Sequence, residues 1–173
     1  IGNARARKGD CILRFADLAE DTKHLLLVVV PERRLEPLEH LLTLLNGGER
    51  GRVWLAACMQ RRGDDRRRLT RLKAIASAAH VPLLAVNDVL YADPEQRDLQ
   101  DVVTCIREGT TISEAGRLLE VNAERHLKTP EEMARLFADC PEAIEETQNL
   151  LGKIGFSLDQ LECEPAAASV AFA

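Results

Sequence analysis

The chain has 173 residues, of which 46% are apolar and 29% are charged, and its formal net charge is −5. This balance is typical of a globular protein with a buried core, and the longest uncharged apolar run, residues 25–30, is much shorter than the ~20 residues of a membrane span. The first ten residues are polar and basic with no apolar stretch behind them, which is unlike a signal peptide. We therefore expect a cytoplasmic location and no membrane partner.

Cysteine and aromatic content exclude two further classes of protein. The five cysteines are odd in number and lie 23 or more residues apart, which fits neither a disulfide framework nor a CxxC metal site. Only six aromatic residues occur, too few for a nucleic-acid surface built on stacked rings. We expect reduced thiols that are mostly buried.

The first half of the chain alternates between strand and helix patterns. Apolar runs predict buried strands at 24–30, 53–59 and 83–86. Between them, apolar residues at helical spacing predict helices over 35–45 and 64–79. The short connections imply parallel strand pairing, and hence an α/β fold.

In a parallel sheet, functional sites gather where the strands end at their carboxyl edge. In this sequence that edge comprises Pro31, residues 58–60 and residues 87–91. Nothing before His24 supplies enough strands to close a barrel or complete an open sheet. The first half therefore resembles part of a domain that begins elsewhere.

The second half shows helical patterns only. One helix is predicted from an apolar stripe that ends before Gly109, formed by Leu99, Val102, Val103 and Ile106. Further helices are predicted over 113–119, from Thr129 with Glu132 completing a capping box, and over 141–152.

The charge distribution also divides the chain. Residues 1–93 carry 16 Lys and Arg against 12 Asp and Glu, a net charge of +4, whereas residues 94–173 carry 7 against 16, a net charge of −9. We therefore expect an α/β unit over 1–93, a helical region over 94–164 and a disordered tail over 165–173.

Asp88 is a candidate metal ligand, because it follows the third predicted strand at the carboxyl edge. Turn formation explains the same residue, since Asn and Asp favour turns, and position alone favours this second interpretation. A metal site needs three or four converging ligands, and the four histidines are scattered along the chain. The residues alone therefore predict no assembled catalytic or metal site.

The second predicted helix carries the candidate nucleic-acid-binding residues, which are Arg66, Arg67, Arg71 and Lys73. Phosphate contacts are one interpretation of this cluster. At 3.6 residues per turn, however, the charges spread over more than half of the helix circumference, and Asp64 and Asp65 offset some of them. This spread favours a solvated helix face.

Several strings in the sequence resemble one protein family when they are taken in order. They are ARARKG at 4–9, VWLAACMQRRGDD at 53–65, VPLLAVNDVLY at 81–91, LQDVVTCIREG at 99–109, TISEAGRLL at 111–119, NAERHLKT at 122–129 and EEMARLF at 131–137. From about residue 3 to residue 161, the chain is similar to segments of bacterial C-family DNA polymerases. The similarity is greatest to the error-prone branch of the polymerase III alpha subunit.

This resemblance implies a partial PHP-type βα barrel with parallel strands, followed by the helical region that leads to the polymerase palm. The intact polymerase would bind a DNA template-primer, nucleotides and accessory proteins. Its palm carboxylates, which hold magnesium for nucleotidyl transfer, would lie beyond residue 173. The resemblance therefore places no catalytic residue and no cofactor in this segment.

At the PHP metal site the sequence departs from the pattern of metal-binding relatives. Where these relatives have Asp-x-His after the last strand, this chain has Asp88-Val89-Leu90, and Cys58 stands in place of their glutamate. A leucine cannot coordinate a metal, and one carboxylate does not hold a divalent ion against water. The resemblance thus implies a vestigial metal site at Asp88 and a structural role for the PHP unit.

Three functions of different classes remain open at this point. The leading one is a segment of an error-prone DNA polymerase that supports the palm. The second is a PHP-type metal-dependent phosphoesterase, and the third is a non-enzymatic interaction module.

Overall fold

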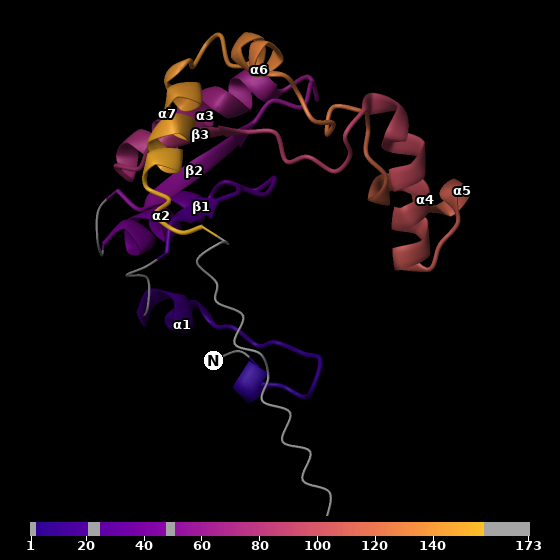
Figure 1. The fold of residues 1–173 in the computed structure, drawn as a ribbon, viewed down its shortest axis with the longest axis horizontal. Coiled ribbons are helices and arrows are strands. Elements are labelled where there is room, and N and C mark those ends of the chain that lie inside the picture. Colours follow the sequence, from indigo (N-terminus) through magenta and orange to yellow (C-terminus); the bar gives the residue numbers. More distant parts are fainter. Residues whose placement is uncertain (1–2, 21–24, 48–50, 158–173) are drawn as a thin grey trace, which may run out of the picture.

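A computed structural model describes residues 3–20, 25–47 and 51–157 of the chain. The predictions for His24 and for the tail at 165–173 lie outside these described residues. The described part combines a small parallel sheet with helices, so the α/β prediction is confirmed (Figure 1).

Three parallel strands form the sheet in the order β1-β2-β3, with β1 at Leu27–Val29, β2 at Val53–Cys58 and β3 at Leu83–Val86. Leu27 lies opposite Val53 in one pair, and Leu55 lies opposite Leu83 in the other. β2 is almost fully buried, as expected of the central strand of a parallel sheet. The three described strands form an open sheet, so they do not confirm the finer prediction of a barrel.

Two helices connect the strands and pack against β2, namely α2 at Leu38–Asn46 and α3 at Asp65–Ala78. α2 begins at Leu38, three residues after the start at residue 35 that the apolar spacing predicts. The delay arises because Pro37 has no N–H group and restricts the residue before it. α3 matches its prediction to within one residue at each end. The core between these helices and the sheet includes Leu42, Leu55 and Leu72, each at most 1% exposed.

The next part of the chain lies apart from the sheet in Figure 1. It forms α4 at Arg97–Glu108 and α5 at Ile112–Ala115, with 3-10 turns at Pro94–Gln96 and Gly116–Leu118. Gly109 ends α4 with a left-handed φ of 63°, which glycine adopts without strain. The apolar stripe of α4 is exposed to solvent, from 41% at Val102 to 75% at Ile106.

The last two described helices return to the α/β core, with α6 at Pro130–Leu136 and α7 at Glu142–Gly152. Thr129 and Glu132 form the predicted capping box, in which the Thr129 hydroxyl accepts a hydrogen bond from the Glu132 N–H at 3.2 Å. Phe137, directly after α6, is fully buried in the core, and α7 packs against β3. The expected domain boundary after residue 93 is not tested by this arrangement and stays a prediction.

The N-terminal segment contains a 3-10 turn at Asn3–Arg5 and α1 at Phe15–Glu20. An ion pair of 2.6 Å between Arg5 and Asp17 connects them. Among the described residues, none of the helices has both the length and the apolar character to cross a membrane.

Candidate functional site

The carboxyl ends of the three strands surround one cleft of about 570 Å³. Pro31 follows β1, Cys58 ends β2 and Asp88 follows β3, and all three line this cleft. The prediction that these positions meet at one edge of the sheet is therefore confirmed. We call Pro31, Cys58, Gln60, Asn87 and Asp88 the rim.

A segment for which the sequence pattern predicts no helix or strand crosses the rim. We call residues 120–128 the rim strap. The Asn122 side-chain amide donates to the Gln60 carbonyl at 2.8 Å, and the Asn87 side-chain amide donates to the His126 carbonyl. Backbone hydrogen bonds also join the strap to the chain that follows β3. The strap therefore ties the ends of β2 and β3 together.

Arg125 of the rim strap contacts the carboxylate of the rim. Its Nη2 lies 2.8 Å from Oδ2 of Asp88, its Nε–H donates to the Asp88 carbonyl at 2.8 Å, and its Nη1 lies 2.7 Å from Oε1 of Glu120. Burial opposes the charged form of Arg125, but the hydrogen bonds and negative charges of Glu120 and Asp88 outweigh it and raise the pKa of Arg125. Arg125 therefore brings a permanent positive charge to the rim.

The backbone of Asp88 has a left-handed conformation, with φ of 50°. Asp and Asn adopt this conformation more readily than other residues with a side chain, which supports the turn interpretation of this position. The Asp88 side chain is 45% exposed, so its ion pair with Arg125 lies at the surface of the cleft.

The donor atoms at the rim do not fit a divalent metal ion. Asp88 is paired with Arg125, and the Leu90 side chain has no donor atom. Burial, followed by the negative charge of Asp88, raises the pKa of the Cys58 thiol to about 11, so this side chain is a neutral thiol in the metal-free chain. Within the described part of the chain, no three His, Cys, Asp or Glu side chains are grouped so that they could hold a metal ion.

The basic residues predicted to bind nucleic acid are mostly paired within the chain. Three pair with carboxylates of other segments: Arg66 with Asp139 at 3.3 Å, Arg71 with Glu36 at 4.0 Å and Lys73 with Glu142 at 2.7 Å. The hydrogen bond from Lys73 is the main reason that the pKa of Glu142 falls to about 2. Arg67 is exposed and has no side-chain partner among the described residues. These pairs join α3 to neighbouring segments, and the nucleic-acid role of the four residues stays a prediction.

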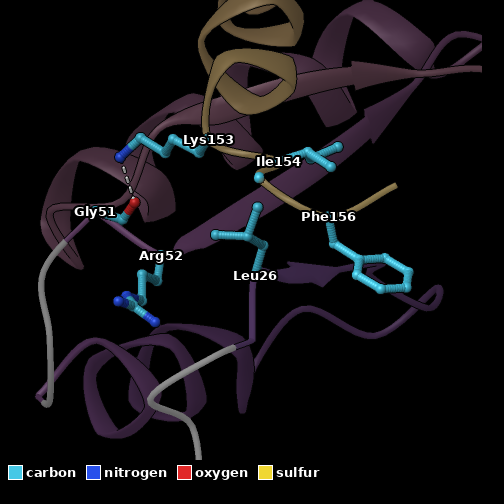
Figure 2. A pocket seen from close by; sticks show the side chains of 7 residues that line it. Leu26, Gly51, Arg52, Lys153, Ile154 and Phe156 are labelled. Carbon is cyan, nitrogen blue, oxygen red and sulfur yellow. Dashed lines mark hydrogen bonds between the residues drawn. The ribbon is translucent and has the colours of Figure 1, made fainter. Parts of the chain in front are cut away.

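A second cleft, of about 620 Å³, lies at the amino-terminal end of the strands (Figure 2). The Lys153 ammonium group donates to the Gly51 carbonyl at 2.6 Å on one side of it. Leu26, Ile154 and Phe156 line the rest together with an arginine and a glycine. No carboxylate, imidazole or thiol occurs among the described residues that line this cleft, so it offers none of the usual metal ligands.

Comparison with known proteins shows which sequences this chain is similar to. No protein-family model matches the chain. An error-prone DNA polymerase of Bradyrhizobium diazoefficiens is 55% identical to it over 159 residues, which cover 91% of this chain. The error-prone DNA polymerases of another Bradyrhizobium strain and of Caulobacter vibrioides are 52% and 46% identical over 91% and 93% of it. The chain is homologous to a segment of the error-prone DNA polymerases.

The resemblance indicated by the sequence strings is thus confirmed. The chain spans only 14% of the length of the two Bradyrhizobium proteins and 15% of the Caulobacter protein. The homology therefore concerns one segment of a much longer polymerase.

The sequence pattern does not predict the rim strap or the role of Arg125. The NAERHLKT string at 122–129 contributes to the family resemblance, but its residues follow neither a helix period nor a strand period. Arg125 lies 37 positions from its partner Asp88. A polar segment with several charges was the only available signal, and such a segment is equally compatible with a solvated loop.

Proposed function

We propose that this chain is a scaffold segment of an error-prone DNA polymerase. It forms the second half of a PHP-type barrel and the helices that lead to the palm. The intact polymerase transfers nucleotides to the primer of a DNA template in the cytoplasm and works with accessory proteins. Its magnesium ions are held by carboxylates outside this segment.

The contact between Arg125 and Asp88 carries the scaffold part of this proposal. A metal-dependent phosphoesterase needs a divalent ion that polarises the phosphate and activates a water molecule. In this chain a guanidinium nitrogen lies 2.8 Å from the carboxylate on which such an ion would depend. A guanidinium group neutralises charge but has no coordination position for water. The rim is therefore suited to structural support and not to hydrolysis.

Two exposed apolar surfaces support a place within a longer polypeptide. The apolar stripe of α4 is open to solvent, and the outer edge of β1 pairs with no other described strand. Contiguous apolar stripes are uncommon on the surfaces of isolated domains, and an unprotected strand edge is a template for pairing with another segment of chain. Because the matched relatives are far longer than this chain, we propose that other parts of the same polymerase cover both surfaces.

Primer extension by the polymerase that contains this segment tests the proposal. The intact protein is expected to extend a DNA primer with magnesium present, and Asp88→Ala is expected to retain that activity per folded molecule. A large loss of extension at an unchanged melting temperature would contradict the scaffold role of the rim. Absence of extension by the unmodified protein would contradict the polymerase function itself.

A phosphoesterase function would require the rim to hydrolyse phosphate esters with a bound metal ion, whereas the scaffold role predicts no hydrolysis. The 173-residue chain is expected to release no phosphate from p-nitrophenyl phosphate when manganese or zinc is added. Asp98→Ala serves as the matched control, because Asp98 is an exposed carboxylate on α4, away from the rim. Metal-dependent hydrolysis that is lost in Asp88→Ala and kept in Asp98→Ala would replace the scaffold role with phosphoesterase activity.

A further inference from the structure

A concave surface of about 750 Å³ lies beside the rim, where loops of the α/β core meet the α4–α5 part of the chain. Four arginines from four different segments line it, namely Arg33, Arg62, Arg97 and Arg117. Glu120 is the one carboxylate among the described residues of this lining. We call this surface the arginine cleft.

Two of the four arginines have partners near the cleft. Nη2 of Arg62 lies 2.9 Å from Oε2 of Glu120, and Nη2 of Arg97 donates to the Glu120 carbonyl at 2.7 Å. The Glu120 carboxylate also faces Arg125, so one negative charge is shared between two guanidinium groups. Asp101 lies 3.7 Å from Arg97 and offsets part of its charge. Positive charge therefore still exceeds negative charge at this surface.

Arg33 and Arg117 supply the uncompensated charge of the cleft. Both residues are exposed, and neither side chain has a hydrogen bond or ion pair with any residue that the structure describes. Like charges gathered on a concave surface raise the local positive potential and attract anions.

The arginine cleft differs in this respect from the basic face of α3. Three of the four basic residues predicted there are paired with carboxylates, so α3 offers less free charge than its sequence indicates. The arginines of the cleft lie 20 to 84 positions apart in the chain, which is why no sequence pattern reveals them. In the folded chain, the strongest candidate anion-binding surface is therefore the arginine cleft, and not the basic face of α3 that the sequence indicates.

We propose that the arginine cleft binds phosphate groups of a single DNA strand. The planar guanidinium group matches two phosphate oxygens at once. No aromatic side chain occurs among the described lining residues, so the contacts go to backbone phosphates and not to stacked bases. Binding is therefore independent of base sequence and depends strongly on salt. The choice of DNA as the strand rests on the proposed polymerase function.

Fluorescence anisotropy of a labelled oligodeoxythymidylate with the full 173-residue chain tests this site. Arg33→Gln/Arg117→Gln is compared with Arg66→Gln/Arg67→Gln, which removes the same charge from α3. The cleft pair is expected to weaken binding about tenfold and to lower the slope of log K against log salt by about 1.4, since each single-strand phosphate contact contributes about 0.7. The α3 pair is expected to weaken binding less than about twofold, because neither Arg66 nor Arg67 lines the arginine cleft.

Two controls distinguish the loss of charge from a loss of folding. All four substituted side chains are exposed, so circular-dichroism melts of the variants are expected to match that of the unmodified chain. Arg33→Lys/Arg117→Lys keeps the charge and is expected to retain most of the binding. No binding by the unmodified chain, equal weakening by the two glutamine pairs, or full loss in the lysine pair would overturn the proposal.

Competition distinguishes a DNA strand from a free nucleotide. Unlabelled oligodeoxythymidylate is expected to displace the probe at a lower phosphate concentration than thymidine triphosphate or inorganic triphosphate. Displacement by the triphosphates at the lower concentration would overturn the assignment to a strand. Primer extension is measured independently, so failure of the cleft leaves the polymerase function intact, and failure of extension leaves the binding result intact.

Discussion

Different forces hold the centre of the sheet and its rim. The centre is built from apolar side chains such as Leu55 and Leu84, which are 0% and 3% exposed. The rim is joined by the Arg125–Asp88 ion pair and by side-chain hydrogen bonds of the rim strap. Apolar burial scales with area and dominates stability, whereas a partly exposed ion pair contributes little but fixes geometry. We therefore expect the centre to set the stability of the fold and the rim to set what can bind there.

The largest effect is expected at the centre of the sheet. Leu84→Ala removes a buried side chain from β3 and is expected to lower the free energy of unfolding by about 2–5 kcal/mol. Urea denaturation of the full chain measures this change. Leu151→Ala is the matched control, because Leu151 on α7 is 60% exposed and its loss is expected to cost less than about 0.5 kcal/mol. Equal costs for the two variants would contradict the placement of β3 in the core.

A smaller effect is expected at the rim. Arg125→Met leaves Asp88 and Glu120 without their shared partner and is expected to cost about 1–2 kcal/mol, since Asp88 is still partly solvated. Arg135→Met, on the exposed surface of α6, is expected to cost less than about 0.5 kcal/mol. In a double-mutant cycle, Arg125→Met and Asp88→Asn are expected to be non-additive. Full additivity would show that the two side chains do not interact in solution.

A substitution at the start of α6 is expected to lower stability by as much as the Arg125 substitution or by less. Thr129→Ala removes the hydroxyl that accepts the Glu132 N–H and is expected to cost about 1 kcal/mol. Thr129→Ser keeps the hydroxyl and is expected to restore most of the loss. Thermal unfolding measures both, and a serine variant as unstable as the alanine variant would contradict the capping role.

The smallest effect is expected from the exposed pair between Lys73 and Glu142. The pKa of Glu142 is about 2, below its ordinary value of 4.5, so the stability linked to its charge is present above pH 4.5 and is lost as the pH falls toward 2. Solvent screening keeps this contribution small. Carboxyl NMR titration is expected to show the Glu142 pKa rising toward 4.5 in Lys73→Met. An unchanged pKa would show that Lys73 is not its cause.

The parts of the fold that follow a local period are predictable from the sequence. The third strand is found at the predicted residues, and the capping box at Thr129 is found as predicted, because both depend on neighbouring residues. α2 begins three residues after its predicted start, because Pro37 interrupts the helix that the apolar spacing predicts. The sequence also predicts that Asp88 lies at the carboxyl edge.

The partner of Asp88 is not predictable in the same way. Arg125 reaches it only because the chain leaves the sheet through α4 and α5 and returns across the rim. The arginine cleft depends on the same return, since Arg33 and Arg117 belong to segments that no local pattern connects. Long-range ion pairs follow from the path of the chain and not from residue periodicity.

Thermal melting with added metal tests most directly whether Arg125, and not a metal ion, neutralises Asp88. A metal that bound the folded chain at the rim would raise its melting temperature by mass action. We expect no change in the melting temperature of the full chain with millimolar manganese or zinc. A rise that disappears in Asp88→Asn would contradict the replacement of the metal ion by Arg125.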